Sequence, residues 1–329
     1  MHSLNIPHLP DDLTLDDLDQ ITIPKPTKPD IVAVRLGLLC TLYVQHPQDP
    51  AVKQALAECG DQYQAMFGAH LTLYLNPTGD GRFVRYPKGG VSLAAYVASN
   101  NTPDRFLAPS FTSGTSFRDA APYSLDIWAP DPAYFKARDR MAYFSATLPF
   151  AFLKDQPGTG AFQRLVHGWC RILKPYCGYA GIGAIQSVEG AERDRTAYDV
   201  YPIAMRFPGV EIEDAGSVAR HLGSHIKGVN WLTALSDEVL APIGGRQALL
   251  AQLDENFVIM EYEGGVLIQA GPAPELGDVN RQQIPRFYRQ LSRLVRPLRM
   301  TFPKGDSFIR PPNPDENTEA TNRWLARFD

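Results

Sequence analysis

The sequence lacks the features that mark secreted, membrane-spanning and zinc-binding proteins. It has four cysteines in 329 residues, too few for a disulfide framework, and none forms a CxxC pair of the kind that binds zinc. They are Cys40, Cys59, Cys170 and Cys177. The N-terminus has no basic stretch followed by an apolar run, and no apolar window reaches the ~18 residues of a membrane span. We therefore expect a cytoplasmic protein with free thiols, no bound metal and no membrane contact.

An excess of positive charge is also missing. The formal net charge is −4 and the isoelectric point is near 6.0, whereas nucleic-acid-binding domains usually carry a basic patch and a high isoelectric point. Hydrophobic residues make up 44% of the chain, which is enough to build a core. The balance predicts a globular protein without direct contact to nucleic acid.

No catalytic motif is present in its proper context. The serines of 111–117, FTSGTSF, lack the GxSxG elbow, and 177–184, CGYAGIGA, lacks the third glycine of a dinucleotide loop, so close packing of a strand explains its glycines. HLGSH at 221–225 has the i,i+4 histidines of a helical metal site, but neither the glutamate of a zincin nor an evident third ligand. We predict no catalytic residues, no metal ligands and no cofactor.

An N-terminal arm, residues 1–30, precedes the folded part. Residues 11–19, DDLTLDDLD, hold five aspartates and are compatible with a short acidic helix. The next segment, PKPTKPD at 24–30, is predicted to be an extended linker because each proline disfavours helix at the residue before it.

A first α+β half is predicted over 31–187. The aliphatic run at 31–44 indicates a buried strand, and the 3–4 spacing of apolar residues in 51–67 indicates an amphipathic helix. The turn NPTGDG between 71–75 and 82–86 predicts a hairpin. The other predicted elements are helices at 92–99 and 161–173 and strands at 123–129, 143–153 and 177–185.

A second half, 228–303, repeats this order more compactly. Its predicted elements are strands at 228–235, 257–262, 265–270 and 298–302 and helices at 245–253 and 281–295. Strand–helix–strand–strand–helix–strand is the split βαβ order, so we predict an α+β fold of antiparallel sheets packed by helices, as two ferredoxin-like halves. Residues 188–227 form the predicted connector and 304–329 a C-terminal tail.

The stretch GGVLIQAGPAPELGD, residues 264–278, invites comparison with a phosphate-binding loop. Its prolines, Pro272 and Pro274, remove backbone N–H donors that a phosphate would need, and no helix follows a GxGxxG pattern. Gly264 suits a tight turn, and Asp278 is placed to cap a helix. The pattern predicts a strand, a turn and a helix start.

Acidic segments are the remaining candidates for function. In EYEGG, Glu261 and Glu263 flank Tyr262 and therefore share a strand face, which a solvated surface would explain. The sharper interpretation is an acidic surface complementary to a basic partner, such as the DNA-binding cleft of a nuclease. From charge alone we predict these partner-binding residues: Glu211, Glu213, Asp214, Glu261 and Glu263.

Two C-terminal segments resemble the TsiV-like family of type VI secretion immunity proteins, which neutralise VRR-Nuc nuclease toxins. They are GVNWLTALSDEVLAPIGG at 228–245 and GGVLIQAGPAPELGDVNRQQIPRFYRQLSRLVRPLR at 264–299. Trp231, the IQAGPxPxLGD run and the RPLR ending occur together and in order. A looser similarity extends back through 122–128 and 143–153.

The resemblance implies a binding protein and not an enzyme. Its expected partner is a cognate VRR-Nuc effector, a PD-(D/E)xK-type nuclease that cuts DNA with a divalent metal, bound as a heterodimer in the cytoplasm with its substrate cleft occluded. The family motif would be scaffold. Two other readings stay open from the residues: an enzyme with a composite polar pocket, and a structural or regulatory part of a secretion apparatus that self-associates through an apolar patch.

Overall fold

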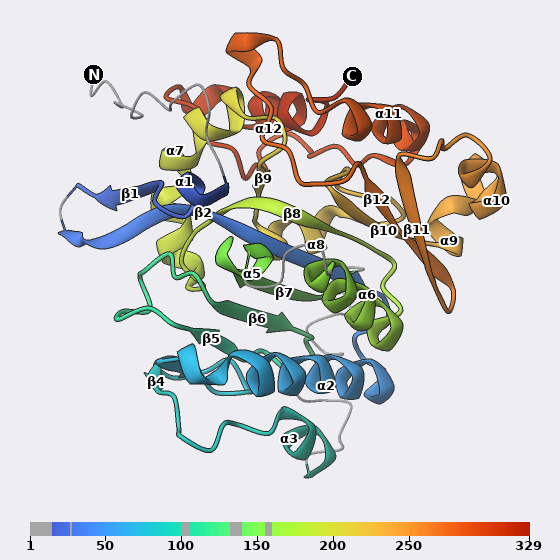
Figure 1. Cartoon of the computed structure of the whole chain (residues 1–329). Coiled ribbons are helices and arrows are strands. Elements are labelled where there is room, and N and C mark those ends of the chain that lie inside the picture. Colours follow the sequence, from blue (N-terminus) through green and yellow to red (C-terminus); the bar gives the residue numbers. More distant parts are fainter. Residues whose placement is uncertain (1–14, 27, 100–105, 132–139, 155–159) are drawn as a thin grey trace.

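A computed structural model describes residues 15–26, 28–99, 106–131, 140–154 and 160–329 (Figure 1). The strands are β1 (Thr22–Lys25), β2 (Lys28–Val44), β3 (Leu73–Leu75), β4 (Val84–Arg85), β5 (Ser110–Thr112), β6 (Ser124–Trp128), β7 (Ala142–Leu148), β8 (Cys177–Ile185), β9 (Glu211–Ile212), β10 (Leu232–Ser236), β11 (Phe257–Tyr262) and β12 (Gly265–Ala270). The α-helices are α1 (Leu15–Leu18), α2 (Pro50–Phe67), α3 (Leu93–Ser99), α5 (Ala151–Lys154), α6 (Ala161–Leu173), α7 (Gly190–Arg206), α8 (Ala215–His221), α9 (Asp237–Leu240), α10 (Gly245–Leu250), α11 (Arg286–Val295) and α12 (Asn317–Leu325).

Within these residues the strands form one 12-stranded sheet with the order β11-β12-β10-β8-β2-β7-β6-β5-β3-β4. All neighbours on this path are antiparallel, and β1 and β9 pair beside it with β2 and β8. Helices cover the sheet, as the ribbon shows (Figure 1). The predicted α+β class is confirmed.

The first half has the predicted split βαβ topology. Its four main strands lie in the order β8-β2-β7-β6, which is fourth, first, third and second along the chain, with α2 and α6 as the crossover helices. The predicted hairpin around NPTGDG forms between β3 and β4. The segment from β3 to β5 is inserted between α2 and β6 and extends the sheet beyond β6.

The second half departs from the prediction at its last strand. β10, β11 and β12 take the first, second and third positions of the motif, but the fourth position, beside β10, is held by β8 of the first half. The strand predicted at 298–302 is wrong: this segment begins in a 3-10 turn and makes only one parallel bridge, Ile226 to Arg299. The edge of β10 that this strand would need is already paired with β8. Strand β8 therefore belongs to both halves and joins them in one sheet.

Strand β2 shows how the sheet is buried on both sides. Successive side chains of a strand point to opposite faces. Leu42 faces the layer of α2 and α6, where the rings of Trp169 and Phe144 pack at a tilt with centroids 4.8 Å apart. Tyr43 faces the layer that contains β9 and α12 and hydrogen-bonds through its hydroxyl to Tyr179, 3.0 Å away. Burial on both faces explains the continuous apolar run.

The segments predicted to be a linker and a connector contain regular elements. The linker prediction for 24–30 is wrong because β1 and β2 form a hairpin across it, and the register slips at Pro24, a residue that an edge strand tolerates. The connector 188–227 contains α7, β9 and α8.

The glycine-rich stretch forms the predicted strand and turn, but Asp278 starts a 3-10 turn, Val279–Arg281, and the helix predicted from 281 begins only at Arg286. Gly264 adopts φ +80° in the β11–β12 turn. Asp278 accepts a hydrogen bond from the backbone N–H of Asn280 and forms an ion pair with Arg206 at 2.9 Å. These contacts, the one with Arg206 foremost, lower the pKa of the Asp278 carboxyl. The glycines of β8 are explained by close packing, since a Cβ on Gly181 would lie 2.1 Å from Oδ1 of Asn230.

Candidate functional site

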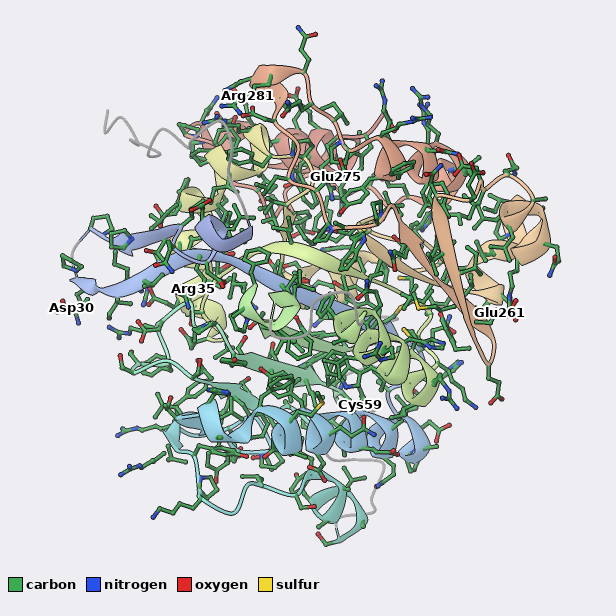
Figure 2. All side chains as sticks on the ribbon, viewed as in Figure 1. Asp30, Arg35, Cys59, Glu261, Glu275 and Arg281 are labelled. Carbon is green, nitrogen blue, oxygen red and sulfur yellow. The ribbon has the colours of Figure 1, made fainter. Side chains whose placement is uncertain are left out.

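The exposed acidic residues of the β11–β12 hairpin are available to a partner. The Glu261 and Glu263 side chains are 64% and 80% exposed, and Tyr262 between them is buried with its hydroxyl donating to the carbonyl of Pro175. Figure 2 shows Glu261 near the tip of the hairpin. The predicted alternation of these three side chains is confirmed.

Helix α9 brings two more carboxylates, Asp237 and Glu238, to this tip. The N–H of Asp237 donates to the carbonyl of Gly264 at 2.8 Å, which fixes the start of α9 against the turn. Arg246 donates two hydrogen bonds of 2.7 and 2.6 Å to Asp237, and these bonds raise the pKa of the Arg246 guanidinium. The same guanidinium lies 3.4 Å from Glu261, and Lys174 lies 2.7 Å from Glu263.

We call this surface the acidic hairpin patch. It is defined by six residues: Asp237, Glu238, Glu261 and Glu263, with the cations Lys174 and Arg246. Four carboxylates thus face two cations, so the patch as defined is net negative. Its charges are exposed enough to act on an approaching protein, although each exposed pair adds only about 0–1 kcal/mol to stability.

The other acidic segment, 211–214, does not form an exposed surface. Glu211 and Glu213 are 3% and 8% exposed, so their prediction as surface residues is wrong. Strand β9 pairs in parallel with β8 and directs both carboxylates into the layer between the sheet and α12. Asp214 caps α8 by accepting from the N–H of Ser217.

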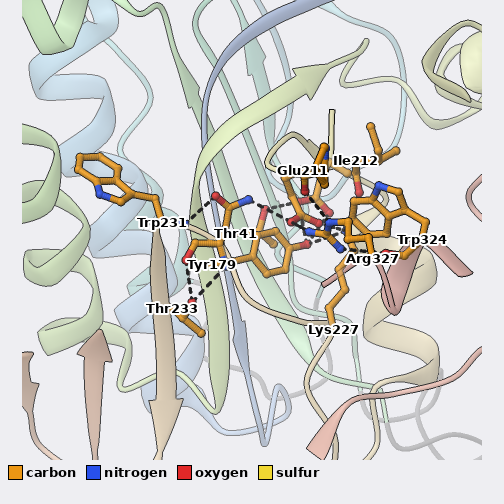
Figure 3. Close-up of polar contacts among 12 residues, drawn as sticks. Thr41, Tyr179, Glu211, Ile212, Lys227, Trp231, Thr233, Trp324 and Arg327 are labelled. Carbon is orange, nitrogen blue, oxygen red and sulfur yellow. Dashed lines mark hydrogen bonds and ion pairs between the residues drawn. The ribbon is translucent and has the colours of Figure 1, made fainter. Parts of the chain in front are cut away.

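A buried ionic network holds Glu211 (Figure 3). Lys227, 2% exposed, lies 2.8 Å from Glu211 and also donates to the carbonyl of Ile212. Arg327 reaches Glu211 from the C-terminal end of the chain at 3.2 Å and stacks on the ring of Trp324 with its guanidinium 3.6 Å from the centroid. The network therefore ties α12 to the sheet.

Glu213 is held by hydroxyl groups. Thr41 and Tyr179 both donate to its carboxylate, Tyr179 at 2.9 Å. Burial raises the pKa of Glu213, and the nearby charge of Lys227 opposes this shift. The sequence could not reveal these partners because they lie up to 172 residues away along the chain.

Two cavities are relevant to the alternative interpretation that the chain is an enzyme with a polar active-site pocket. The first, beside Asp126, Arg193 and Glu213, encloses about 30 Å³, roughly the volume of one water molecule. The second is an open cleft of about 1530 Å³ between α2 and residues 85–92. Its central acid, Asp61, is already bound to the backbone N–H groups of Leu93 and Ala94 at 2.7 and 3.1 Å.

The histidine pair of HLGSH does not share a helix face. Helix α8 ends at His221, which lies 3.2 Å from Asp306, and His225 follows on an exposed turn. The segment is therefore the end of a helix, and its two histidines do not lie on one helix face. In the described part of the chain, no three histidine, cysteine or acidic side chains are grouped as metal ligands would be.

The cysteines are buried free thiols, as predicted, and burial raises the pKa of each. None of the described helices combines the length and the apolarity needed to cross a membrane.

The chain is thus an α+β protein with exposed charged side chains at the tip of the β11–β12 hairpin. The chain belongs to the TsiV family, described as type VI immunity for VRR-NUC, and the match spans residues 55–328. It is similar in structure to the T6SS protein PA0821 of Pseudomonas aeruginosa, with a TM-score of 0.81 and 27% identity over 94% of this chain and 87% of that one. No curated protein matches the sequence.

Proposed function

We propose that this protein binds a cognate VRR-Nuc effector of a type VI secretion system and neutralises it by occluding its DNA-binding cleft. The observation that carries the proposal is the family match over residues 55–328. The acidic hairpin patch supports the mechanism, because a nuclease cleft that binds the phosphate backbone is basic and attracts an acidic surface.

The partner is a PD-(D/E)xK-type nuclease held in a heterodimer. In this mechanism the immunity protein has no catalytic activity of its own and does not contact DNA. It acts in the cytoplasm, where the effector would meet its substrate. Neutralising a lethal enzyme calls for nanomolar or tighter binding, about −12 kcal/mol, and an interface of this strength typically buries about 1,600 Å² in total.

The acidic hairpin patch acts mainly on the rate of encounter. Exposed charges of opposite sign steer two proteins together, whereas apolar and arginine anchors inside a polar rim hold the complex. Higher salt should therefore slow association far more than it speeds dissociation.

The proposal is tested by expressing the nuclease effector encoded next to this chain's gene, with and without this protein. Cells that produce both are expected to survive with intact DNA, and the two proteins are expected to co-purify. An effector without its catalytic metal ligands serves as the control for toxicity. Continued killing, with no complex recovered, would show that this pair is not an effector and its immunity protein.

A further inference from the structure

A groove along α11 presents three arginines on one helix face. Arg286, Arg289 and Arg293 occupy positions i, i+3 and i+7, which lie on one side of a helix, while Tyr288 and Leu291 on the other side are buried in the core. The groove has a volume of about 510 Å³. Figure 2 shows nitrogen-tipped side chains gathered above the α11 ribbon.

The charge of this groove is only partly neutralised within the described part of the chain, where the Asp254 carboxylate interacts with Arg286. Arg289 and Arg293 have no acidic partner there, unlike Arg206, Arg299 and Arg327, which all form ion pairs. The Nε of Arg289 is buried and has no hydrogen-bond partner among the described residues. Since Arg293 is exposed and Arg289 is partly exposed, the positive charges of both are open to an acceptor from outside the chain.

The side chains that line the groove determine which kind of acceptor it can bind. A guanidinium binds a carboxylate with two parallel hydrogen bonds, and the partly buried Ile284 and Leu294 offer an apolar floor for an aliphatic side chain. Asp254 lies at the edge of the groove, 3.4 Å from Gln290. Its charge, with that of the exposed Glu255, disfavours a continuous phosphate backbone, which carries many negative charges, more than a short peptide with one or two carboxylates.

We propose that this arginine groove, formed by Arg286, Arg289 and Arg293, docks an acidic peptide segment of the cognate effector. This inference rests on the proposed function and adds a second contact to it. Strand β11 links the two surfaces: its first residue, Phe257, packs against Phe287 of α11, and its far end carries the acidic hairpin patch. The separation along the strand is about 20 Å, which one interface of ordinary size can span.

The test uses the full-length protein and the neighbouring effector made inactive at its metal ligands, with the dissociation constant measured by calorimetric titration. The double variant Arg289→Gln, Arg293→Gln is expected to bind at least tenfold more weakly, mainly through faster dissociation. Arg293→Gln alone, at an exposed position, should give a smaller loss in the same direction and guards against a folding defect. The control, Arg220→Gln with Arg323→Gln, removes two exposed arginines elsewhere and should bind as the wild type does.

The outcomes separate the groove from the proposed function. Unchanged affinity in both groove variants, with a wild type that binds, would overturn the groove and leave the immunity function standing. A wild type that does not bind the effector would contradict both. A short DNA duplex that binds the wild type and not the double variant would show a nucleic-acid site and overturn the acidic peptide.

Discussion

Replacing Lys227 with alanine is expected to lower the free energy of unfolding by about 3–5 kcal/mol, the usual effect of removing one partner from a buried ion pair. The ammonium lies 2.8 Å from Glu211 and 4.9 Å from the ring centroid of Tyr179. Without it, Glu211 keeps only Arg327 as a cationic partner, and Glu213 loses the nearby charge of Lys227. Both carboxylates would stay buried with less positive charge to compensate them.

Urea unfolding of the purified variant measures this loss as a lower midpoint at an unchanged slope. The matched control is Lys304→Ala, which removes an exposed lysine and should change stability by no more than about 0.5 kcal/mol. A Lys227→Ala variant as stable as the control would contradict the view that this network fastens α12 to the sheet.

Reversing two charges of the acidic hairpin patch, Glu261→Lys with Glu263→Lys, is expected to slow association with the effector by about 10- to 100-fold, within the range known for electrostatic steering. The variant also leaves Lys174 and Arg246 without these partners, so the hairpin tip becomes positive. Stopped-flow mixing at several salt concentrations measures the rate, and the wild-type rate should fall steeply as salt rises.

The control variant for this reversal is Glu316→Lys with Glu319→Lys, which makes the same change in net charge at exposed positions at the start of α12. It should associate nearly as fast as the wild type. If both double variants slowed association equally, total charge and not the hairpin would steer the encounter. A wild-type rate that does not depend on salt would also argue against steering.

Local patterns in the sequence predicted most of the individual elements. The β11 and β12 strands were predicted with their observed bounds because their hydrophobic runs are short and bounded by a turn with glycine at positive φ. The prediction of a last strand at 298–302 failed because β8 already pairs with the edge of β10 that this strand would need. No local sequence pattern reveals this pairing. Sharing of one strand by two halves is a property of the whole sheet.

Of the acidic residues predicted to bind a partner, only those of the hairpin could be recognised as exposed from the sequence. Glu261 and Glu263 lie just before the turn glycines and alternate with a buried tyrosine, so their exposure could be inferred locally. Glu211 and Glu213 have the same alternating pattern, yet their partners include Lys227 and Arg327, and Arg327 is 116 residues away from Glu211. Charge in a sequence does not tell whether a distant cation will neutralise it in the interior.

The arginine groove was missed for a related reason. The spacing of Arg286, Arg289 and Arg293 is visible in the sequence, but the seven other arginines and lysines from Arg281 to the C-terminus look the same until their ion pairs are known. What distinguishes the groove is the lack of acidic partners for Arg289 and Arg293 among the described residues.

The most direct test of the central claim is the DNase activity of the purified effector, measured on linear duplex DNA with Mg²⁺ as this protein is added. The account predicts that activity falls in proportion to the added protein and is lost at one molecule per effector, because nanomolar binding is stoichiometric at micromolar concentration. Full DNA cleavage in the presence of a molar excess of correctly folded protein would contradict it.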